Sequence, residues 1–415
     1  ECLGSDLVGL RYQAPFYDLP VQQGVEHRVI AWDQVGSEEG TGIVHIAPGA
    51  GAEDFVLGNE QGLAVIAPLD EFGDFKEGFG LLEGVNVFDA QKIIFNELRI
   101  KGVFYKVEDY SHRYPICWRC GTELVFRLVD EWYISMSDLR PLMTAMTKKI
   151  KWIPGFGLER ELDWLRNMRD WMISKKRYWG LALPIYKCAC GNVDVLGSEV
   201  ELKERAVKGW DEFQGKTPHR PWIDAVVITC SKCNAYVHRI PDVGNAWLDA
   251  GIVPYSTLGY RNDRKHWKDW FPADWISESF PGQFRNWFYS LLAMSATLRN
   301  EEPFKAVFTY GLLNDEHGKA MHKSGPNAIL FDEAAKKMGV DVMRWMYARA
   351  NPAANLNFGY QSGDEVRRHF ILPLWNVYSF FVTYANLDGF DPSFAANRQR
   401  SDLDRWIQSE LQVLI

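Results

Sequence analysis

The stretch Asn314-Asp315-Glu316-His317-Gly318-Lys319-Ala320-Met321-His322-Lys323-Ser324-Gly325-Pro326-Asn327 decides how the rest of the chain is interpreted. It is a polar segment with two glycines, and it follows an apolar run at residues 306–313. After it we predict a helix that Asp332 caps and Gly339 ends. A loop of this kind can bring a lysine and backbone N–H groups to a polyphosphate. Taken alone, however, such a loop is more often a solvated connection, so the neighbouring sequence must decide.

The order of residues in this stretch resembles the lysine signature loop of class I aminoacyl-tRNA synthetases. In this match Lys323 and Ser324 take the places of the second lysine and the final serine, and Met321 and His322 complete the expected catalytic loop. The resemblance implies that Lys323 stabilises the phosphates of ATP, bound with Mg²⁺, while an aminoacyl-adenylate forms. Ala320 replaces the first lysine of the family pattern, and His322 replaces its first serine.

Three further blocks continue the resemblance in the same order as in the family. Residues 168–180 resemble a block of the isoleucine-type members and argue mainly against the valine type, whereas residues 243–251 and 278–288 resemble two core blocks. One more residue separates Glu278 from Gln283 than in the family pattern, and core packing is an equally open role for Trp287. The resemblance implies that the adenylate is bound by Glu278, Gln283, Trp287 and Asp249, with Arg285 lining the same pocket.

Residues 40–55 resemble the editing pocket of isoleucyl- and valyl-type members and argue against the leucine type. The resemblance implies that Asp54 holds the α-ammonium group of a mischarged amino acid, and that His45 and Thr41 belong to the same pocket. Editing answers a physical limit, because one methylene group in an apolar pocket discriminates by only about 10–200-fold. That magnitude is known from isoleucine-type enzymes and is not deduced from this chain. Without the resemblance, a histidine and an aspartate at these places are more often structural.

The seven cysteines form three close pairs and leave Cys2 single. Short spacings favour metal binding in a reducing compartment over disulfides. The pair Cys188 and Cys190 precedes the pair Cys230 and Cys233 by about 40 residues, a pattern that predicts a closed tetrahedral zinc site, with unliganded buried thiols as the alternative. The remaining knuckle consists of Cys117 and Cys120, and the resemblance puts its partner pair upstream of this chain.

The expected fold class is α/β: the second half of a class I synthetase Rossmann-type catalytic domain, with a β-rich editing portion, a zinc ribbon and the start of an α-helical bundle. The predicted segments are 1–110 for editing, 111–187 for the return to the catalytic domain with a Cys knuckle, 188–240 for the zinc ribbon, 241–355 for the nucleotide-binding core and 356–415 for the start of the anticodon-binding helices. Within them we expect strands at 29–32, 42–46 and 124–128, and helices at 90–101 and 158–170.

The bulk composition restricts the function without naming it. The 415 residues are 47% hydrophobic and carry a net charge of −8, which is ordinary for a globular protein and argues mildly against a nucleic-acid partner. No apolar run predicts a membrane span, and the first residues do not resemble a signal peptide. Both ends look like cuts through a longer protein.

The resemblance implies an isoleucine–tRNA ligase with hydrolytic editing of valyl-tRNA. Its expected cofactors are ATP with Mg²⁺ and Zn²⁺, its partners are isoleucine and tRNA(Ile), and we expect a cytoplasmic monomer. The chain lacks the first half of the nucleotide-binding fold, so we expect it to be inactive alone. A valyl- or leucyl-tRNA synthetase remains an alternative, as does a non-catalytic zinc-containing module that binds tRNA or a partner. Ala320 and His322 favour that last interpretation.

Overall fold

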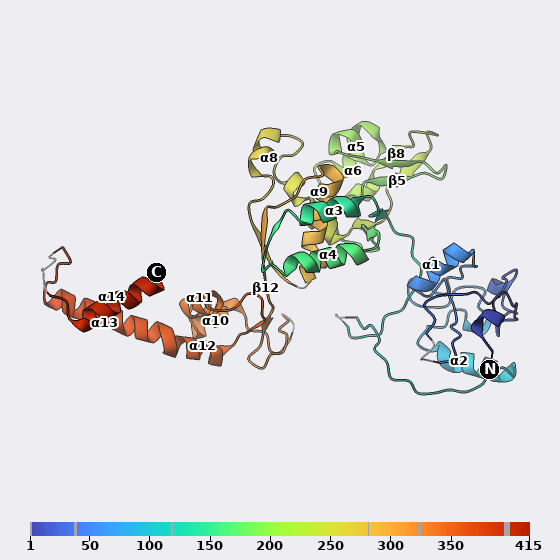
Figure 1. Cartoon of the computed structure of the whole chain (residues 1–415). Helices are drawn as coiled ribbons and strands as arrows, with labels where there is room; N and C mark the ends of the chain where they lie inside the picture. The colour runs from blue at the N-terminus through green and yellow to red at the C-terminus, as the bar shows by residue number, and fades with distance from the viewer. Residues whose placement is uncertain (1, 37–39, 118–119, 281, 323–324, 394–398) are drawn as a thin grey trace. The chain divides into compact units, whose positions relative to one another are not determined.

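The computed structural model describes residues 2–36, 40–117, 120–280, 282–322, 325–393 and 399–415. The chain divides into two compact units, Glu1–Asp130 and Glu131–Ile415 (Figure 1). The domain boundaries expected from the sequence stay predictions. Within the described residues, no helix combines the length and the apolar character that crossing a lipid bilayer requires.

The first unit contains the helices α1 (Ala52–Gln61) and α2 (Ala90–Ile100) and the 3₁₀ turns η1 (Gly4–Asp6), η2 (Pro20–Gln22) and η3 (Gly80–Leu82). Helix α2 confirms the prediction for residues 90–101. Helix α1 ends at Gly62, whose φ of 65° lies in the left-handed region that a helix terminus of this type requires.

The strands expected at 29–32, 42–46 and 124–128 are absent from the described part of the first unit, so that prediction is wrong. Isolated bridges such as Arg11↔Arg28 take their place. A strand needs a partner that continues over several residues. Here the backbone N–H of Val29 donates to the carbonyl of Leu10, and the carbonyl of Val29 accepts the N–H of Gly9. No regular ladder continues from these two hydrogen bonds in the described residues.

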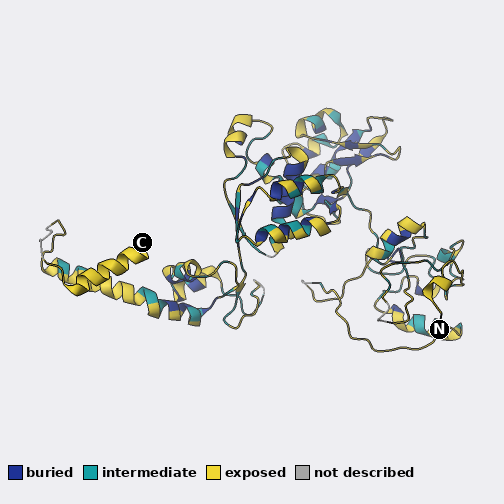
Figure 2. Ribbon diagram, viewed as in Figure 1, coloured by how far each residue is buried: buried dark blue, intermediate teal, exposed yellow. Residues whose placement is uncertain are grey.

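Burial differs between the two units (Figure 2). The buried apolar side chains described in the first unit are Pro48, Leu57, Leu69, Leu82 and Ala90. The four clusters of buried apolar side chains found among the described residues all belong to the second unit.

The second unit is built on a parallel sheet with the strand order β11 (Ile276–Ser279), β12 (Ala306–Tyr310) and β2 (Lys151–Ile153). The chain passes from β11 to β12 through the turn η5 (Gly282–Arg285) and helix α9 (Trp287–Leu298). This is the β-α-β arrangement expected for an α/β catalytic core, and it confirms the predicted fold class in its coarse form.

Helix α9 lies at the centre of the core, and all its residues from Phe288 to Ala296 are buried. It packs against α3 (Leu139–Thr147) and α7 (Ala246–Ser256). A Cβ atom at Gly251 of α7 would lie 2.7 Å from the carbonyl oxygen of Ser290, so only glycine allows the two backbones to approach this closely. Helix α4 (Gly157–Asn167) confirms the helix predicted at 158–170, although it ends earlier.

A ribbon of antiparallel strands follows. One hairpin pairs β5 (Ile185–Lys187) with β6 (Val193–Val195), and a sheet has the order β7 (Ala206–Lys208), β8 (Val227–Thr229) and β9 (Tyr236–His238). Short helical segments complete it: α5 (Glu199–Arg205), α6 (Trp210–Phe213) and η4 (Trp222–Ala225). Its buried cluster includes Tyr186, Ile228 and the cysteines Cys188 and Cys230.

Two short antiparallel ladders join other segments of the second unit. Strand β1 (Tyr133–Ile134) pairs with β3 (Trp171–Met172), and β4 (Ser174–Lys175) pairs with β10 (Val243–Gly244). Helix α8 (Arg264–Trp270) contributes Trp267 to an aromatic cluster with Tyr255 and Phe271.

The C-terminal part begins with β13 (Leu313–Asn314), which pairs in parallel with β14 (Leu356–Asn357). The helices are α10 (Phe331–Lys337), α11 (Val340–Ala348), α12 (Tyr360–Val366), the π-helical turn η6 (Arg367–Ile371), α13 (Leu372–Leu387) and α14 (Asp402–Leu414). Helix α10 confirms the helix expected after the signature loop. The predicted N-cap was wrong, because the helix starts at Phe331 with Leu330 as the N-cap, so that Asp332 lies in the first turn.

Candidate functional site

Asp315 and Asn327 join the two ends of the segment 314–327. One carboxylate oxygen of Asp315 accepts the backbone N–H groups of His317 and Lys319, both at 2.9 Å, and the other accepts the side-chain amide of Asn327 at 2.9 Å. The same amide nitrogen lies 3.1 Å from the carbonyl oxygen of Ala320. Gly318, with a φ of 78°, completes the turn between them. These hydrogen bonds lower the pKa of Asp315, with the one from Asn327 contributing most.

The predicted phosphate-binding residues occupy different positions in this loop. Met321 is half-buried and packs against the cluster of Ala334 and Met338, whereas His322 is exposed. Lys323 and Ser324 lie outside the described residues. Because Ala320 contributes its backbone carbonyl to the frame, an alanine side chain at this position is compatible with the loop's hydrogen bonds.

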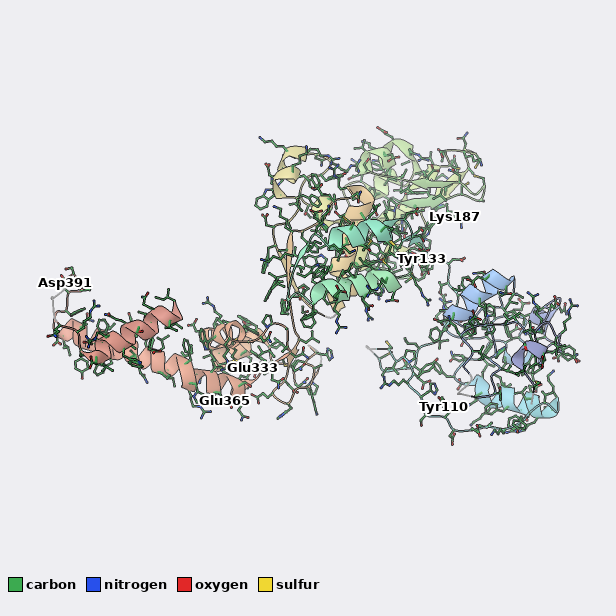
Figure 3. The ribbon with its side chains drawn as sticks, viewed as in Figure 1. Tyr110, Tyr133, Lys187, Glu333, Glu365 and Asp391 are labelled. Atoms are coloured by element: carbon green, nitrogen blue, oxygen red, sulfur yellow. The ribbon has the colours of Figure 1, made fainter. Side chains whose placement is uncertain are left out.

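The loop is attached to the helices that follow it. Glu316 accepts the backbone N–H of Gln361, in the first turn of α12, at 2.5 Å. Glu333 of α10, labelled in Figure 3, accepts the hydroxyl of Tyr360 at 2.9 Å and the ammonium of Lys337 at 2.7 Å. The hydrogen bond to Glu316 therefore joins the loop to the start of α12.

The residues expected to bind the adenylate lie largely at one edge of the parallel sheet. Glu278 is near the carboxyl end of β11, the edge at which α/β sheets bind ligands. Its carboxylate accepts the backbone N–H of Ser279 at 2.7 Å. Gln283 follows in η5, and its side-chain oxygen accepts the backbone N–H of Trp287 at 3.2 Å, at the start of α9.

Asp249 and Arg285 differ from these residues in their surroundings. Asp249 is exposed on α7, and no contact between it and Glu278 or Gln283 is described. The guanidinium of Arg285 lies 5.7 Å from the ring centroid of Trp164, a cation–π distance, so α4 also contributes to this edge of the core. Trp287 is half-buried and packs against the central core, in agreement with the packing role considered above.

The predicted editing residues separate into two groups in the first unit. Thr41 and His45 line a cavity of about 1320 Å³ together with residues such as Tyr12 and Trp32. Asp54 does not line this cavity; its carboxylate accepts the backbone N–H of Ala47 at 2.9 Å from the first turn of α1. The structure thus brings Thr41 and His45 together and gives Asp54 a structural contact.

The four cysteines of the ribbon converge on one point. The Sγ atoms of Cys188 and Cys233 are 3.5 Å apart, and those of Cys190 and Cys230 are 3.7 Å apart. All four sulfurs lie within 4.8 Å of one another. A zinc ion with bonds of about 2.3 Å to four tetrahedral sulfurs requires separations of about 3.8 Å, so the donor set fits Zn²⁺.

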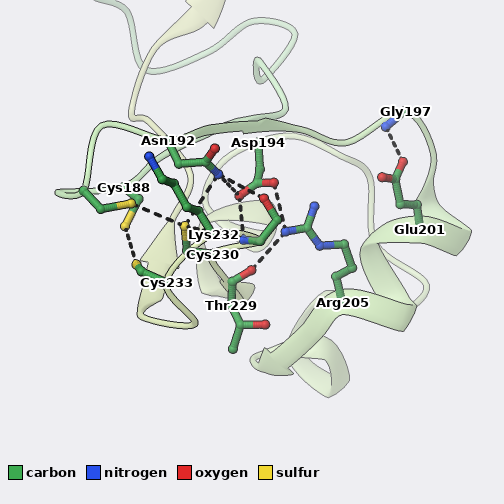
Figure 4. A network of polar contacts seen from close by, with 12 residues as sticks. Cys188, Asn192, Asp194, Gly197, Glu201, Arg205, Thr229, Cys230, Lys232 and Cys233 are labelled. Carbon is green, nitrogen blue, oxygen red and sulfur yellow. Dashed lines mark hydrogen bonds and ion pairs between the residues drawn. The ribbon is translucent and has the colours of Figure 1, made fainter.

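The four thiols are not electrostatically alike. The backbone N–H groups of Cys233 and Lys232 hydrogen-bond to the sulfur of Cys230 and lower its pKa to about 6, whereas neighbouring thiols and burial raise the pKa of Cys188 to about 12 and also raise that of Cys233. Figure 4 shows these residues with the polar side chains beside them. A metal ion can be held by cysteine, histidine, aspartate or glutamate. Among the described residues, the four cysteines of the ribbon are the one group of three or more such side chains close enough to do so.

Cys117 and Cys120 do not join that cluster. Their knuckle is closed by the backbone N–H of Cys117, which donates to the carbonyl of Thr122 at 2.7 Å. The hydroxyl of Thr122 lies 2.8 Å from the sulfur of Cys120, and this contact lowers the pKa of Cys120 to about 7. No third metal ligand is described beside this pair.

Sequence reasoning missed the residues that hold these sites in shape. Asp315 and Asn327 frame the signature loop, and Asn192 and Asp194 lie beside the cysteines. The loop frame had a detectable signal, because an aspartate three residues before a glycine is typical of a tight turn. Asn192 had no comparable signal, since it bonds to residues about 40 positions away.

The comparisons with known proteins agree with this geometry. A family model described as tRNA synthetases class I (I, L, M and V) matches residues 25–359. The chain is 38% identical over 417 residues to the isoleucine–tRNA ligase of Methanothermobacter marburgensis, an alignment that covers 98% of this chain and 39% of the relative. The isoleucine–tRNA ligase of Methanothermobacter thermautotrophicus is 39% identical over 414 residues, with coverages of 98% and 39%.

A bacterial relative gives a similar result. The isoleucine–tRNA ligase of Thermus thermophilus is 38% identical over 421 residues, covering 99% of this chain and 39% of the relative. The chain therefore spans about 39% of the length of these relatives. The family match covers most of the chain, including the parallel core, the four-cysteine ribbon and the framed loop, and the chain belongs to the class I tRNA synthetases of the I, L, M and V group, as a homologue of isoleucine–tRNA ligases.

Proposed function

We propose that this chain supplies the second part of the catalytic unit of an isoleucine–tRNA ligase, together with part of its editing site. The observation that carries the proposal is the loop framed by Asp315 and Asn327, which follows the parallel sheet in a chain of this family. In the proposed site Lys323, Ser324 and His322 face the phosphates of ATP, and Met321 fixes the loop to α10.

The proposed reaction has two steps. A carboxylate oxygen of isoleucine attacks the α-phosphorus of ATP, and pyrophosphate leaves with the electrons of the broken bond. A ribose hydroxyl of tRNA(Ile) then attacks the isoleucyl carbonyl, and AMP leaves. The chain's part is to bind and orient the adenylate through Glu278, Gln283 and Trp287, and to offset negative charge through Lys323. Bound Mg²⁺ would further neutralise the phosphates.

Pyrophosphate exchange by the full-length protein tests the amino-acid specificity. We expect isoleucine to stimulate exchange more than valine or leucine at equal concentration. Faster exchange with valine or leucine would select the corresponding synthetase instead. The chain of 415 residues alone should show no exchange, and robust turnover by it would contradict our assignment of only part of the site to this chain.

Substitution of Lys323 separates a ligase from a binding module. Lys323→Ala in the full-length protein should lower isoleucine-dependent exchange by about 10²–10³-fold, because a positioned cation is lost. Unchanged exchange would remove the catalytic role of the loop and favour a module that binds tRNA or a partner through the zinc ribbon.

We further propose that valyl-tRNA is hydrolysed at a site that includes the cavity lined by Thr41 and His45. Asp54, which does not line this cavity, would hold the α-ammonium group from outside it. Asp54→Asn keeps an oxygen that can accept the N–H of Ala47 but removes the negative charge. This variant should deacylate valyl-tRNA at least about 10-fold more slowly while its isoleucylation is unchanged. Glu60→Gln, on the same helix, is the matched control.

The remaining proposals follow from the same assignment. Cys188, Cys190, Cys230 and Cys233 would hold one structural Zn²⁺, whose role is to close the ribbon. We propose a monomer that acts in the cytoplasm on tRNA(Ile), as expected for an isoleucine–tRNA ligase.

A further inference from the structure

Asn192 lies between the two cysteine loops of the ribbon (Figure 4). Its amide nitrogen Nδ2 is 3.5 Å from the Sγ atom of Cys230 and 3.0 Å from Oδ2 of Asp194. It is also 3.0 Å from Oγ of Ser231. A residue of the first loop thus contacts a ligand of the second loop and the residue that follows that ligand.

The short spacing of the first pair explains this position. Cys188 and Cys190 are separated by one residue, and Gly191, with a φ of 85°, reverses the chain immediately after them. The backbone N–H of Cys188 then donates to the carbonyl of Asn192 at 2.9 Å, and that of Gly191 donates to the carbonyl of Cys188 at 3.0 Å. The turn therefore brings the side chain of Asn192 to face Cys230.

Asp194 and Arg205 fix the amide in this orientation. Oδ2 of Asp194 accepts both Asn192 and the backbone N–H of Ser231, the latter at 3.2 Å. Oδ1 of Asp194 lies 3.2 Å from the guanidinium of Arg205, which also donates to the carbonyl of Thr229 at 2.9 Å. Because Asp194 is an acceptor only, it determines that the NH₂ end of the amide faces the cysteine.

We propose that Asn192 is a positioning residue for the metal: its amide, oriented by Asp194, donates to the thiolate of Cys230 and couples the shortened cysteine loop to the second one. The inference rests on the zinc site proposed above. Four thiolates around Zn²⁺ carry a net charge of about −2, so an additional donor stabilises the loaded site more than the empty one. The two hydrogens of the amide serve the sulfur of Cys230, Oδ2 of Asp194 and Oγ of Ser231, so one of them is shared between two acceptors.

Metal binding by the full chain tests this role. We expect Asn192→Ala to weaken Zn²⁺ affinity by about 10–100-fold, the usual effect of losing a hydrogen bond to a ligand. Affinity is measured by competition with a chromophoric chelator. Co²⁺ substituted for Zn²⁺ supplies a second readout, because loss of the N–H donor should shift the thiolate-to-metal charge-transfer band to lower energy.

Three variants separate positioning from general destabilisation. Asn192→Asp replaces the donor by a carboxylate near the thiolates and should weaken affinity more than Asn192→Ala. Asp194→Asn loses the anion that orients the amide and should show an intermediate effect. Gln214→Ala removes an exposed amide elsewhere in the same ribbon and should bind Zn²⁺ like the wild type.

Each outcome decides one point. Unchanged affinity and an unshifted Co²⁺ band in Asn192→Ala would overturn the role of Asn192 while leaving the zinc site intact. A wild-type chain that binds neither Zn²⁺ nor Co²⁺ would overturn the zinc site and this inference together. Both results are independent of aminoacylation, so they do not depend on the ligase activity.

Discussion

The carboxylate of Glu316 accepts the backbone N–H of Gln361 at 2.5 Å, which connects the signature loop to the first turn of α12. The approach is so close that a Cβ atom at Gly359 would lie 1.9 Å from Cγ of Glu316. Gly359 itself has an extended backbone that any residue could adopt, so the side chain of Glu316, and not backbone strain, explains the glycine. The loop and the helices after it are therefore expected to move together.

Removal of this connection should impair the loop more than the fold. Glu316→Ala takes away one acceptor from a helix N-terminus, with an expected cost of about 1 kcal/mol in the free energy of unfolding. In the full-length protein we expect a higher KM for ATP in pyrophosphate exchange, because the loop is less well positioned. Glu316→Gln keeps an acceptor oxygen and should resemble the wild type. Equal KM values in all three proteins would contradict the connection.

The sequence could predict the parts of this site that depend on local order. The loop 314–327, the helix after it and the α/β core follow from spacing and family resemblance. The frame formed by Asp315 and Asn327 could have been inferred, at least in part, from turn chemistry. The contact of Glu316 with Gln361 could not, since it joins residues 45 positions apart through a backbone group that shows no pattern in the sequence.

The failures have a similar physical origin. Residues 29–32 and 42–46 have the composition of strands. A strand also needs a second segment that pairs with it over several residues, and the pattern within one segment does not reveal whether such a partner is present. The role of Asp54 as a ligand-binding carboxylate stays a prediction; the structure adds a hydrogen bond to Ala47 that the residue type alone does not predict.

A second prediction concerns Glu161 of α4, which is fully buried and whose carboxylate oxygens have no hydrogen-bond partner among the described residues. Burial raises the pKa of Glu161 well above its usual range. The folded state therefore binds a proton that the unfolded state releases, and stability is lost as the pH rises from the ordinary Glu value through the raised one. Glu161→Met removes this loss.

Thermal unfolding at two pH values tests the effect of Glu161. We expect Glu161→Met to raise stability by about 1–3 kcal/mol at pH 8, with a smaller gain at pH 5. The control is Glu159→Met, an exposed position on the same helix, which should change little at either pH. A gain that does not depend on pH would mean that packing, and not ionisation, is responsible.

A third prediction tests the centre of the core. Phe288 is completely buried and contacts the rings of Trp152, Phe284 and Phe304. Phe288→Ala should lower the free energy of unfolding by about 3–5 kcal/mol, because it leaves a cavity between α9 and the sheet. Phe331→Ala is the matched control, since that side chain is 66% exposed and its loss should change stability by less than about 0.5 kcal/mol. Denaturant unfolding measures the free energy of unfolding of both variants, and the comparison holds where its dependence on denaturant concentration equals that of the wild type.

The last prediction concerns the number and the effect of bound metal ions. We expect one Zn²⁺ per chain, held by the ribbon, because the four sulfurs that lie within 4.8 Å of one another all belong to it. Cys230→Ser should abolish this zinc and expose the ribbon's buried cluster to hydrogen exchange, since the ligand also lies in that cluster. The double variant Cys117→Ser and Cys120→Ser should retain one Zn²⁺ per chain. Zinc content by elemental analysis that falls in the double variant, or that stays at one in Cys230→Ser, would assign the metal to the other pair.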